Sequence, residues 1–275
     1  MAAKNATKKK LPQEAKSPTP PPPRPVSVEE RTAALEARLL RTDAAFQATY
    51  RHRLDMSWIY HDSALEGVVY TESELATALD PNGTAVALES GMQPVCEEIR
   101  RHRKALDFIR TQAGERQEPI SVDFIRELYL ILHPEEGDAK SVRYRKDIPQ
   151  HRLYFHEYAA PDKIATKVRA VSDWINDPET KKSKSPMRLA SRAHYDLLRV
   201  FPFPHDSGKV ARLLLNLLLL RAGLPPAIIH MSERQRYYEA LKGSSATMNS
   251  IVHDAIDNNL KSIEKLLDAY EARHG

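Results

Sequence analysis

The leucine-rich stretch at residues 213–220 constrains the fold of this 275-residue chain more than any other feature. Seven of its eight positions are leucine, and the remaining one is asparagine. A helix that is apolar on nearly every side has no face to turn to water, so it must lie at the centre of a core. Two prolines in residues 201–204 prevent helix formation there, so one helix should end near Val200 and the central one should begin near Ser207.

The composition excludes several classes of protein. No apolar run approaches the roughly 18 residues that a membrane-spanning helix needs. No apolar stretch follows the basic residues near the N-terminus, so a secretory signal is not expected. Cys96 is the only cysteine, which excludes an internal disulfide and a multi-cysteine metal site and favours a reducing, cytoplasmic location.

Residues 1–26 differ from the rest of the chain in charge and in proline content. They hold six basic residues against Glu14, a net charge of +5, whereas the whole chain carries +4, so residues 27–275 sum to −1. This disfavours nucleic acid as a partner except through the basic tail. Seven prolines in the tail predict a disordered, extended segment, and Pro20 and Pro23 also have the PxxP spacing of a short docking motif.

Capping signals and apolar spacing predict the helices. Ser27 with Glu30, and Thr71 with Glu74, have the spacing of a capping box. A turn is expected at residues 80–83. Helices are expected at about residues 27–60, 71–79, 92–113, 122–132, 162–176, 187–200, 208–222, 232–242 and 250–271.

Residues 142–158 break the helical pattern. They are rich in aromatic and branched residues, and Pro149-Gln150 lies near their middle, which predicts a single β-hairpin on the helical body. Two strands are marginally stable alone, so this hairpin needs a helix or a partner to pack against.

The start of the central helix has the features of an anion site. The backbone N–H groups of Ser207, Gly208 and Lys209 have no partner within the helix, and the helix dipole adds partial positive charge there. Arg212 lies one turn further on the same face. The alternative interpretation is an ordinary N-cap, formed by Asp206 or Ser207, with two solvated cations.

Residues 201–212 resemble, without a gap, the signature loop of the Fic (Fido) family, His-Pro-Phe-x-Asp/Glu-Gly-Asn-Gly-Arg-x-x-Arg. The residues around His194 resemble the helix before that loop, and Gly223-Leu-Pro-Pro and Arg234-x-x-Tyr-Tyr resemble the segments after it. The similarity extends over about residues 45–270. It implies a mainly α-helical, Fido-type bundle with one β-hairpin flap.

The resemblance divides the chain into three parts. These are a basic, proline-rich tail over 1–26, N-terminal helices with an inhibitory-type motif over 27–120, and a Fido core with flap and signature loop over 121–275. The family's N-terminal inhibitory arrangement is compatible with a monomer or a homodimer.

The resemblance also implies roles for individual residues. The family transfers AMP, or another phosphate-bearing group, from a nucleotide such as ATP to a protein hydroxyl, with Mg²⁺ on the phosphates. The matching phosphate- and nucleotide-binding positions are Ser207, Gly208, Lys209 and Arg212. The flap holds a protein segment by strand addition, and its matching positions are Arg143, Tyr144 and Arg145.

An inhibitory-type motif is the last part of the resemblance. Residues 63–67, Ser-Ala-Leu-Glu-Gly, resemble the family motif whose glutamate pairs with the second arginine of the loop and blocks the γ-phosphate. Here that pair would be Glu66 with Arg212. The position that usually holds Ser or Thr is Asp62. The alternative is that Glu66 caps a turn at Gly67 and the pair is only structural.

Several loop positions carry residues that cannot perform the family's chemistry. Phe201 stands where the family has its catalytic histidine, and a phenyl ring has no lone pair to accept a proton. His205 replaces the acidic magnesium ligand, and Mg²⁺ prefers oxygen to imidazole, so no metal site is predicted. Asp206 replaces a glycine and would repel phosphate, and Lys209 replaces an arginine and loses its bidentate fork.

These losses favour a pseudoenzyme that lacks standard protein AMPylation and acts by binding a protein segment or a phosphate-bearing ligand. Phe201 and Phe203 are then expected to fill the core beneath the loop.

Two other functions stay open. One is an active nucleotidyl- or phosphate-group transferase with a rebuilt loop, in which His205 acts as the base, Asp206 orients it or binds a metal, and Lys209 and Arg212 hold the phosphate donor. The other is a nucleic-acid binder, which the charge of −1 over residues 27–275 disfavours.

Overall fold

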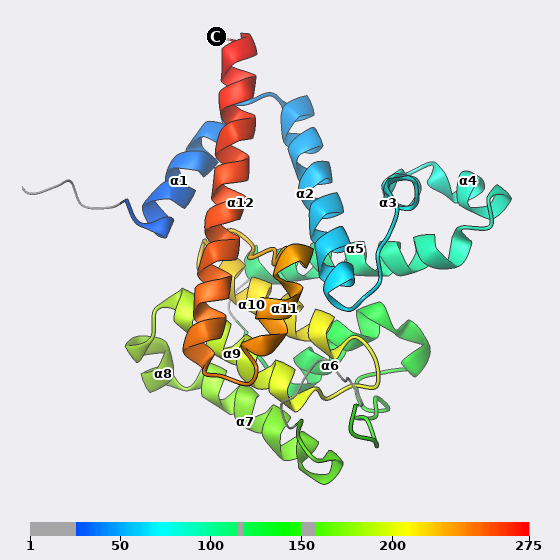
Figure 1. Ribbon diagram of the computed structural model, residues 1–275, viewed down its shortest axis with the longest axis vertical. Helices are drawn as coiled ribbons and strands as arrows, with labels where there is room; N and C mark the ends of the chain where they lie inside the picture. The colour runs from blue at the N-terminus through cyan, green and yellow to red at the C-terminus, as the bar shows by residue number, and fades with distance from the viewer. Residues whose placement is uncertain (1–25, 115–117, 150–157, 275) are drawn as a thin grey trace, which may run out of the picture.

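The structure, a computed structural model, describes residues 26–114, 118–149 and 158–274. In these ranges the chain forms helices and loops, and no residue is in a β-strand (Figure 1). The helices are α1 (Val28–Leu39), α2 (Ala44–Leu65), α3 (Glu72–Leu79), α4 (Gly83–Glu89), α5 (Gln93–Gly114), α6 (Val122–Leu132), α7 (Ile164–Asn176), α8 (Pro178–Ser183), α9 (Pro186–Val200), α10 (Ser207–Arg221), α11 (Arg234–Glu239) and α12 (Ser245–His274). Three 3₁₀ helices join them: η1 (Pro134–Glu136), η2 (Pro161–Lys163) and η3 (Met231–Glu233).

The leucine-rich helix α10 lies at the centre of the bundle, as predicted. It packs against α9, α5, α6 and α2, and 12 of its 15 residues are buried. Its asparagine, Asn216, is also buried, and its amide accepts a hydrogen bond from the backbone N–H of Ala227 at 2.7 Å and donates one to the Ala227 carbonyl at 3.4 Å. The one polar residue of the leucine stretch therefore fixes the chain that returns after α10.

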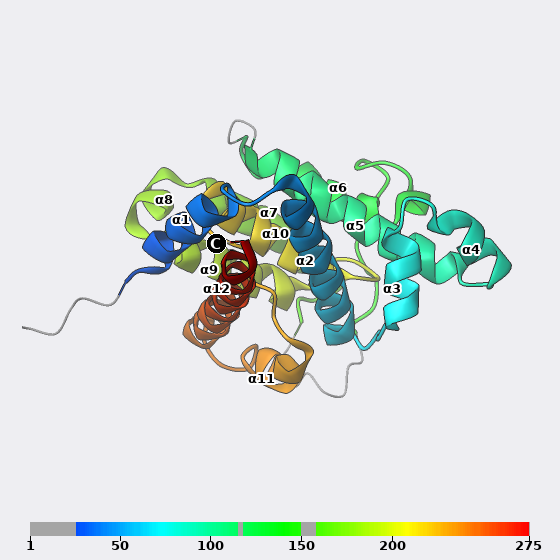
Figure 2. The same cartoon turned by 90° about the horizontal axis from the view of Figure 1, so that it is seen from above.

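The long helix α12 rises out of the bundle, with α1 and α2 on either side of it (Figure 1). It packs against α9 at its N-terminal end and against α1 further along. Arg38 of α1 pairs with Asp268 at 2.6 Å and with Glu271 at 2.8 Å. Seen from above, α3 and α4 extend from the bundle on the side of α5, against which α3 packs (Figure 2).

Both predicted capping boxes are present, but some helix boundaries were wrong. Ser27 with Glu30 and Thr71 with Glu74 exchange the expected side-chain and backbone hydrogen bonds. The single helix expected over 27–60 is instead two, because Asp43 accepts a hydrogen bond from the N–H of Phe46 and starts a new helix there. Two short helices, α4 and α8, were not predicted, and α12 begins five residues earlier than expected.

The β-hairpin expected over residues 142–158 is not shown. Residues 142–149 and 158 run as loop, and residues 150–157 lie outside the described part of the chain. The fold class is therefore mainly α in the described residues, and the flap hairpin stays a prediction. The division of the chain at residue 120 stays a prediction.

Among the helices that the structure describes, none combines the length and the apolar character that crossing a bilayer requires.

Replacing Asn216 with Ala should lower the free energy of unfolding by about 1–3 kcal/mol, because the Ala227 N–H and C=O groups would be left buried without partners. Urea denaturation of both proteins measures the difference. Asn258→Ala is the matched control, since Asn258 is exposed on α12. Equal effects of the two substitutions would contradict this role for Asn216.

Candidate functional site

Two buried aromatic rings pack beneath the loop between α9 and α10. Phe201 is 6% exposed, and its ring centroid lies 5.0 Å from that of Tyr158. Phe203 is buried and stacks on Tyr129 at 4.3 Å. Phe201 ends α9 in the left-handed region, with φ at 49°, and its N–H donates to the Leu197 carbonyl. Both phenylalanines fill the core beneath the loop, and neither presents an acid–base group.

Arg145 fastens the segment after residue 142 to this loop. The residue is 6% exposed, and its guanidinium donates to the backbone carbonyls of Val200, Phe201, Ala159 and Asp147. Its own N–H donates to the Pro202 carbonyl at 3.0 Å. Burial lowers the pKa of this guanidinium. Arg145 is therefore a structural clamp on the loop.

The other two flap positions differ from Arg145. Arg143 is exposed, whereas the ring of Tyr144 is half-buried, under Arg126 and 5.9 Å from Phe203. A role of either residue in holding a target segment stays a prediction.

Arg212 is buried between two acidic residues, Asp62 of α2 and Glu66 at the C-terminal end of the same helix. Its Nη2 lies 2.7 Å from Glu66 Oε1, and its Nε donates to Asp62 Oδ1. The contact between Glu66 and Arg212 that the resemblance implies is thus present, and Glu66 is also the C-cap residue of α2, directly before the turn at Gly67. The second oxygen of Asp62 lies 2.9 Å from His102 Nε2. Burial alone would raise the pKa of Asp62, but Arg212 and His102 hold it at about 2.

The Glu66 carboxylate lies directly against Gly208 at the start of α10. A Cβ atom added to Gly208 would be 1.9 Å from Glu66 Oε1 and 3.0 Å from Arg212 Nη1. The glycine is therefore required for Glu66 to approach the helix so closely. A carboxylate of the protein itself thus occupies the helix N-terminus, where an anion would be expected to bind.

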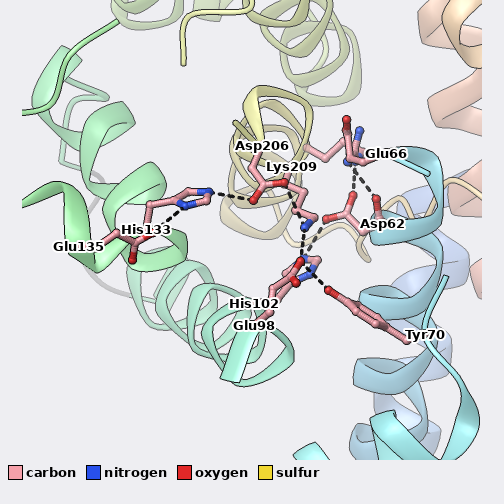
Figure 3. Close-up of polar contacts among 10 residues, drawn as sticks. Asp62, Glu66, Tyr70, Glu98, His102, His133, Glu135, Asp206 and Lys209 are labelled. Carbon is pink, nitrogen blue, oxygen red and sulfur yellow. Dashed lines mark hydrogen bonds and ion pairs between the residues drawn. The ribbon is translucent and has the colours of Figure 1, made fainter. Parts of the chain in front are cut away.

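Lys209, one turn before Arg212 on α10, is paired in the same way (Figure 3). Its Nζ is 3.1 Å from Asp206 Oδ1 and 3.4 Å from Glu98 Oε1, and the side chain is 3% exposed. Glu98 in turn accepts a hydrogen bond from the hydroxyl of Tyr70 at 2.7 Å. Burial would lower the pKa of Lys209, but the charges of Asp206 and Glu98 raise it.

Asp206 stands in the left-handed region, with φ at 48°, at the position where the family has glycine. Its second oxygen lies 2.9 Å from His133 Nε2, and His133 Nδ1 lies 3.1 Å from Glu135 (Figure 3). Burial opposes ionisation of Asp206, but the His133 hydrogen bond and the Lys209 charge hold its pKa well below the ordinary range. His133 is the converse case, because burial lowers its pKa but the two carboxylates raise it overall.

The interpretation of this segment as an ordinary N-cap with two solvated cations was wrong. Lys209 and Arg212 are both buried and paired. Asp206 makes no capping hydrogen bond to α10. The hydroxyl of Ser207 instead bonds the backbone of Phe203, accepting from its N–H at 2.8 Å and donating to its carbonyl at 3.0 Å.

His205 lies on a cavity of about 490 Å³ beside the loop, which Glu98, His133 and Lys209 also line. Its ring is 5.9 Å from that of His133. Asp206 turns to His133 and Lys209, and no hydrogen bond from it to His205 is present in the described residues. In the same ranges, no group of three or more His, Cys, Asp or Glu side chains could hold a metal ion.

A buried histidine, His194, contacts Arg212 through the hydroxyl of Tyr237. His194 Nε2 lies 2.9 Å from the Tyr237 hydroxyl, which also accepts a hydrogen bond from Arg212 Nη1 at 3.3 Å. Burial lowers the pKa of His194 to about 3, so the ring is neutral.

The sequence missed five residues of this site. Glu98 and His102 lie on α5, His133 directly follows α6, Tyr70 precedes α3, and Asp62 was noted only as a departure from the inhibitory motif. The spacing of Glu98 and His102, one turn apart, was the one available signal, and it is weak because charged residues are common on α5.

Comparison with known proteins identifies the family of this arrangement. A model of the Fic/DOC family matches residues 119–219. A relative called Protein adenylyltransferase Fic, from Nematostella vectensis, is 30% identical over 216 residues, which cover 78% of this chain and 48% of the relative. Protein adenylyltransferase fic-1 of Caenorhabditis elegans is 30% identical over 193 residues, covering 67% of this chain and 35% of the relative. The chain thus spans about half the length, or less, of these curated relatives.

Solved structures share the fold. A Fic domain containing signaling protein from Bacteroides thetaiotaomicron superposes with a TM-score of 0.70 at 21% identity, covering 90% of this chain and 98% of that one. Fic-1 from Caenorhabditis elegans superposes with a TM-score of 0.64 at 24% identity, covering 87% and 69% of the two chains. At these identities the likeness concerns the fold alone.

The buried His194 should make the stability of the protein depend on pH. Its folded pKa of about 3 lies below the ordinary value of 6.5, so the unfolded chain binds the proton first. The stability that this residue contributes is full above about pH 6.5 and is lost as the pH falls toward the folded pKa. Between pH 7 and pH 4.5 the free energy of unfolding should fall in both proteins. The fall should be about 1–3 kcal/mol smaller in His194→Gln than in the wild type.

Urea denaturation at the two pH values tests this expectation. His253→Gln is the control, because His253 is exposed on α12. The same pH dependence in wild type and His194→Gln would show that His194 does not titrate differently on folding.

Proposed function

Because this chain belongs to the Fic/DOC family, whose model matches residues 119–219, we propose that it is a Fic-domain protein that has lost standard adenylyl transfer. It acts instead by binding a protein segment or a phosphate-bearing ligand. The observation that carries the proposal is Phe201, which stands in the base position and is buried against Tyr158.

The missing base matters because transfer to a hydroxyl needs a proton acceptor. When the target oxygen forms its bond to phosphorus, its proton must leave, and Phe201 cannot take it. Both ring nitrogens of His133 are already engaged by carboxylates, Nε2 by Asp206 and Nδ1 by Glu135, so neither is open to a target hydroxyl. His205 has the right chemistry, but in the described residues no carboxylate is hydrogen-bonded to it.

The residues present do not fit a magnesium–nucleotide complex. Glu66 fills the place over Gly208, and Arg212 and Lys209 are already neutralised by carboxylates. The position of the family's magnesium ligand holds the imidazole of His205. A triphosphate would have to displace at least Glu66 and Glu98 and leave their charges near its own.

Binding of a protein segment rests on the resemblance of residues 142–145 to the family's flap. The exposed side chains in the described part of this segment include Arg143 and Ile148, which is 58% exposed. Arg145 holds the segment against the loop, so these side chains are displayed on a fixed support. Cytoplasmic location and homodimer formation stay predictions.

The alternative is an active transferase with a rebuilt loop. One observation favours it, namely that His205 lines the 490 Å³ cavity together with Lys209. The pairing of Asp206 with His133 and Lys209 counts against it, because Asp206 then neither orients His205 nor leaves Lys209 free for a phosphate.

We expect Mg²⁺ to add less than about 1 °C to any melting-temperature change that excess ATP causes in the wild type, because both loop cations are already paired. Removing their partners with Glu66→Gly, Glu98→Gln and Asp206→Gly together should increase the stabilisation by ATP by several degrees over that of the wild type. Glu127→Gln, at an exposed position of α6, is the control for a lost carboxylate. Magnesium-dependent stabilisation of the wild type would refute the closed site.

Restoring the chemistry is a separate test. A protein with Phe201→His, His205→Asp, Asp206→Gly and Glu66→Gly should attach label from α-phosphate-labelled ATP to itself or to added protein, at least a hundredfold above the wild type, because a general base contributes about 10²–10⁴ in rate. The matched control carries Phe201→Leu with the other three changes and should stay inactive. Labelling by the wild type would favour the alternative.

A further inference from the structure

A concentration of positive charge lies outside the loop, at the start of α9. Residues 181–192 contain five basic residues, Lys181, Lys182, Lys184, Arg188 and Arg192, and no acidic one. Residues 27–275 as a whole sum to −1, so this local excess is not a property of the whole body. A patch of one sign raises the local concentration of ligands of the opposite sign.

Three of these cations converge on a cavity of about 450 Å³. These three are Lys184, Arg188 and Arg192, which follow one another at intervals of four residues. The two arginines therefore share one face of α9. The cavity lies where α9 meets α7 and the N-terminal end of α12, and these three helices supply all of its lining residues except Lys184. No carboxylate is among the residues that line it in the described chain.

Two of the three cations are free to bind a ligand. In the ranges that the structure describes, the side chains of Lys184 and Arg188 have no hydrogen bond or ion pair. Arg192 is held by Asp196 at 2.6 Å, and its Nη1 lies 3.4 Å from Ser245 Oγ. The contrast with the buried, paired Lys209 and Arg212 makes this the more open anion site of the two.

The opposite wall of the cavity also suits a phosphate ester. Ser245 and Asn249 lie in the first turns of α12, whose positive dipole end favours an anion. The Oδ1 atom of Asn249 is buried without a hydrogen-bond partner in the described residues. A sugar hydroxyl or a base amino group would supply the missing donor.

Trp174 of α7 completes the cavity. It is half-buried and lines the same space as the cations. An indole ring beside positive charge is the pairing that proteins use to stack a nucleobase while they neutralise its phosphate.

We propose that this cavity binds a nucleoside phosphate, with the phosphates on Lys184 and Arg188 and the base against Trp174. The site is separate from the signature loop and does not depend on the function proposed for it.

Tryptophan fluorescence provides a readout specific to this cavity. The chain has two tryptophans, and Trp58 is buried in the core at 2% exposure, so an added ligand reports on Trp174. ATP and AMP without Mg²⁺ should quench this emission saturably, whereas adenosine and tripolyphosphate should bind at least roughly tenfold more weakly.

Variants then locate the bound nucleotide. Arg188→Glu should weaken ATP binding at least roughly tenfold, and Arg188→Lys should weaken it less. Lys182→Glu is the matched control, since it makes the same charge change in the same basic run but does not line the cavity. Equal weakening by Lys182→Glu would show non-specific attraction and overturn the proposal, as would the absence of saturable quenching.

A loop variant separates this proposal from that of the preceding section. Lys209→Gln, checked for retained helix content by circular dichroism below its melting temperature, should leave the quenching by ATP intact. Loss of binding in Lys209→Gln but not in Arg188→Glu would place the nucleotide on the signature loop, which would contradict both proposals. Absence of any nucleotide binding would overturn the present one and leave the closed loop standing.

Discussion

The pairing of Arg212 with Asp62 and Glu66 is the interaction on which the site depends. Arg212 lies on α10, a helix that the leucine stretch places in the middle of the core. An unpaired charge in such a place costs several kcal/mol, so a cation there requires carboxylates within reach. The C-terminal end of α2 supplies both, and this requirement positions α2 against the start of α10.

The same rule accounts for the other half of the loop. Lys209 is also buried, and its partners are Asp206 and Glu98 of α5. An aspartate at position 206 therefore has two physical consequences. It supplies a partner for the lysine, and it puts a negative charge where a phosphate would pass. The charges of the loop are therefore paired within the protein, and its base position is filled by the uncharged Phe201.

Much of this could be predicted from the sequence, because it depends on local patterns. The central helix follows from its leucines, two helix starts from their capping boxes, and the meeting of Glu66 with Arg212 from the resemblance of two short motifs. What could not be predicted depends on contacts between distant segments. His133 and Glu98 reach the loop from α6 and α5, and the clamp formed by Arg145 appears only when its backbone acceptors are in place.

A crystal structure of the wild type grown with saturating ATP and Mg²⁺ would test the central claim most directly. The account predicts Glu66 on Arg212 and Asp206 on Lys209, with no phosphate over Gly208. A triphosphate bound at the start of α10, with Glu66 displaced and Lys209 turned to the phosphates, would contradict it.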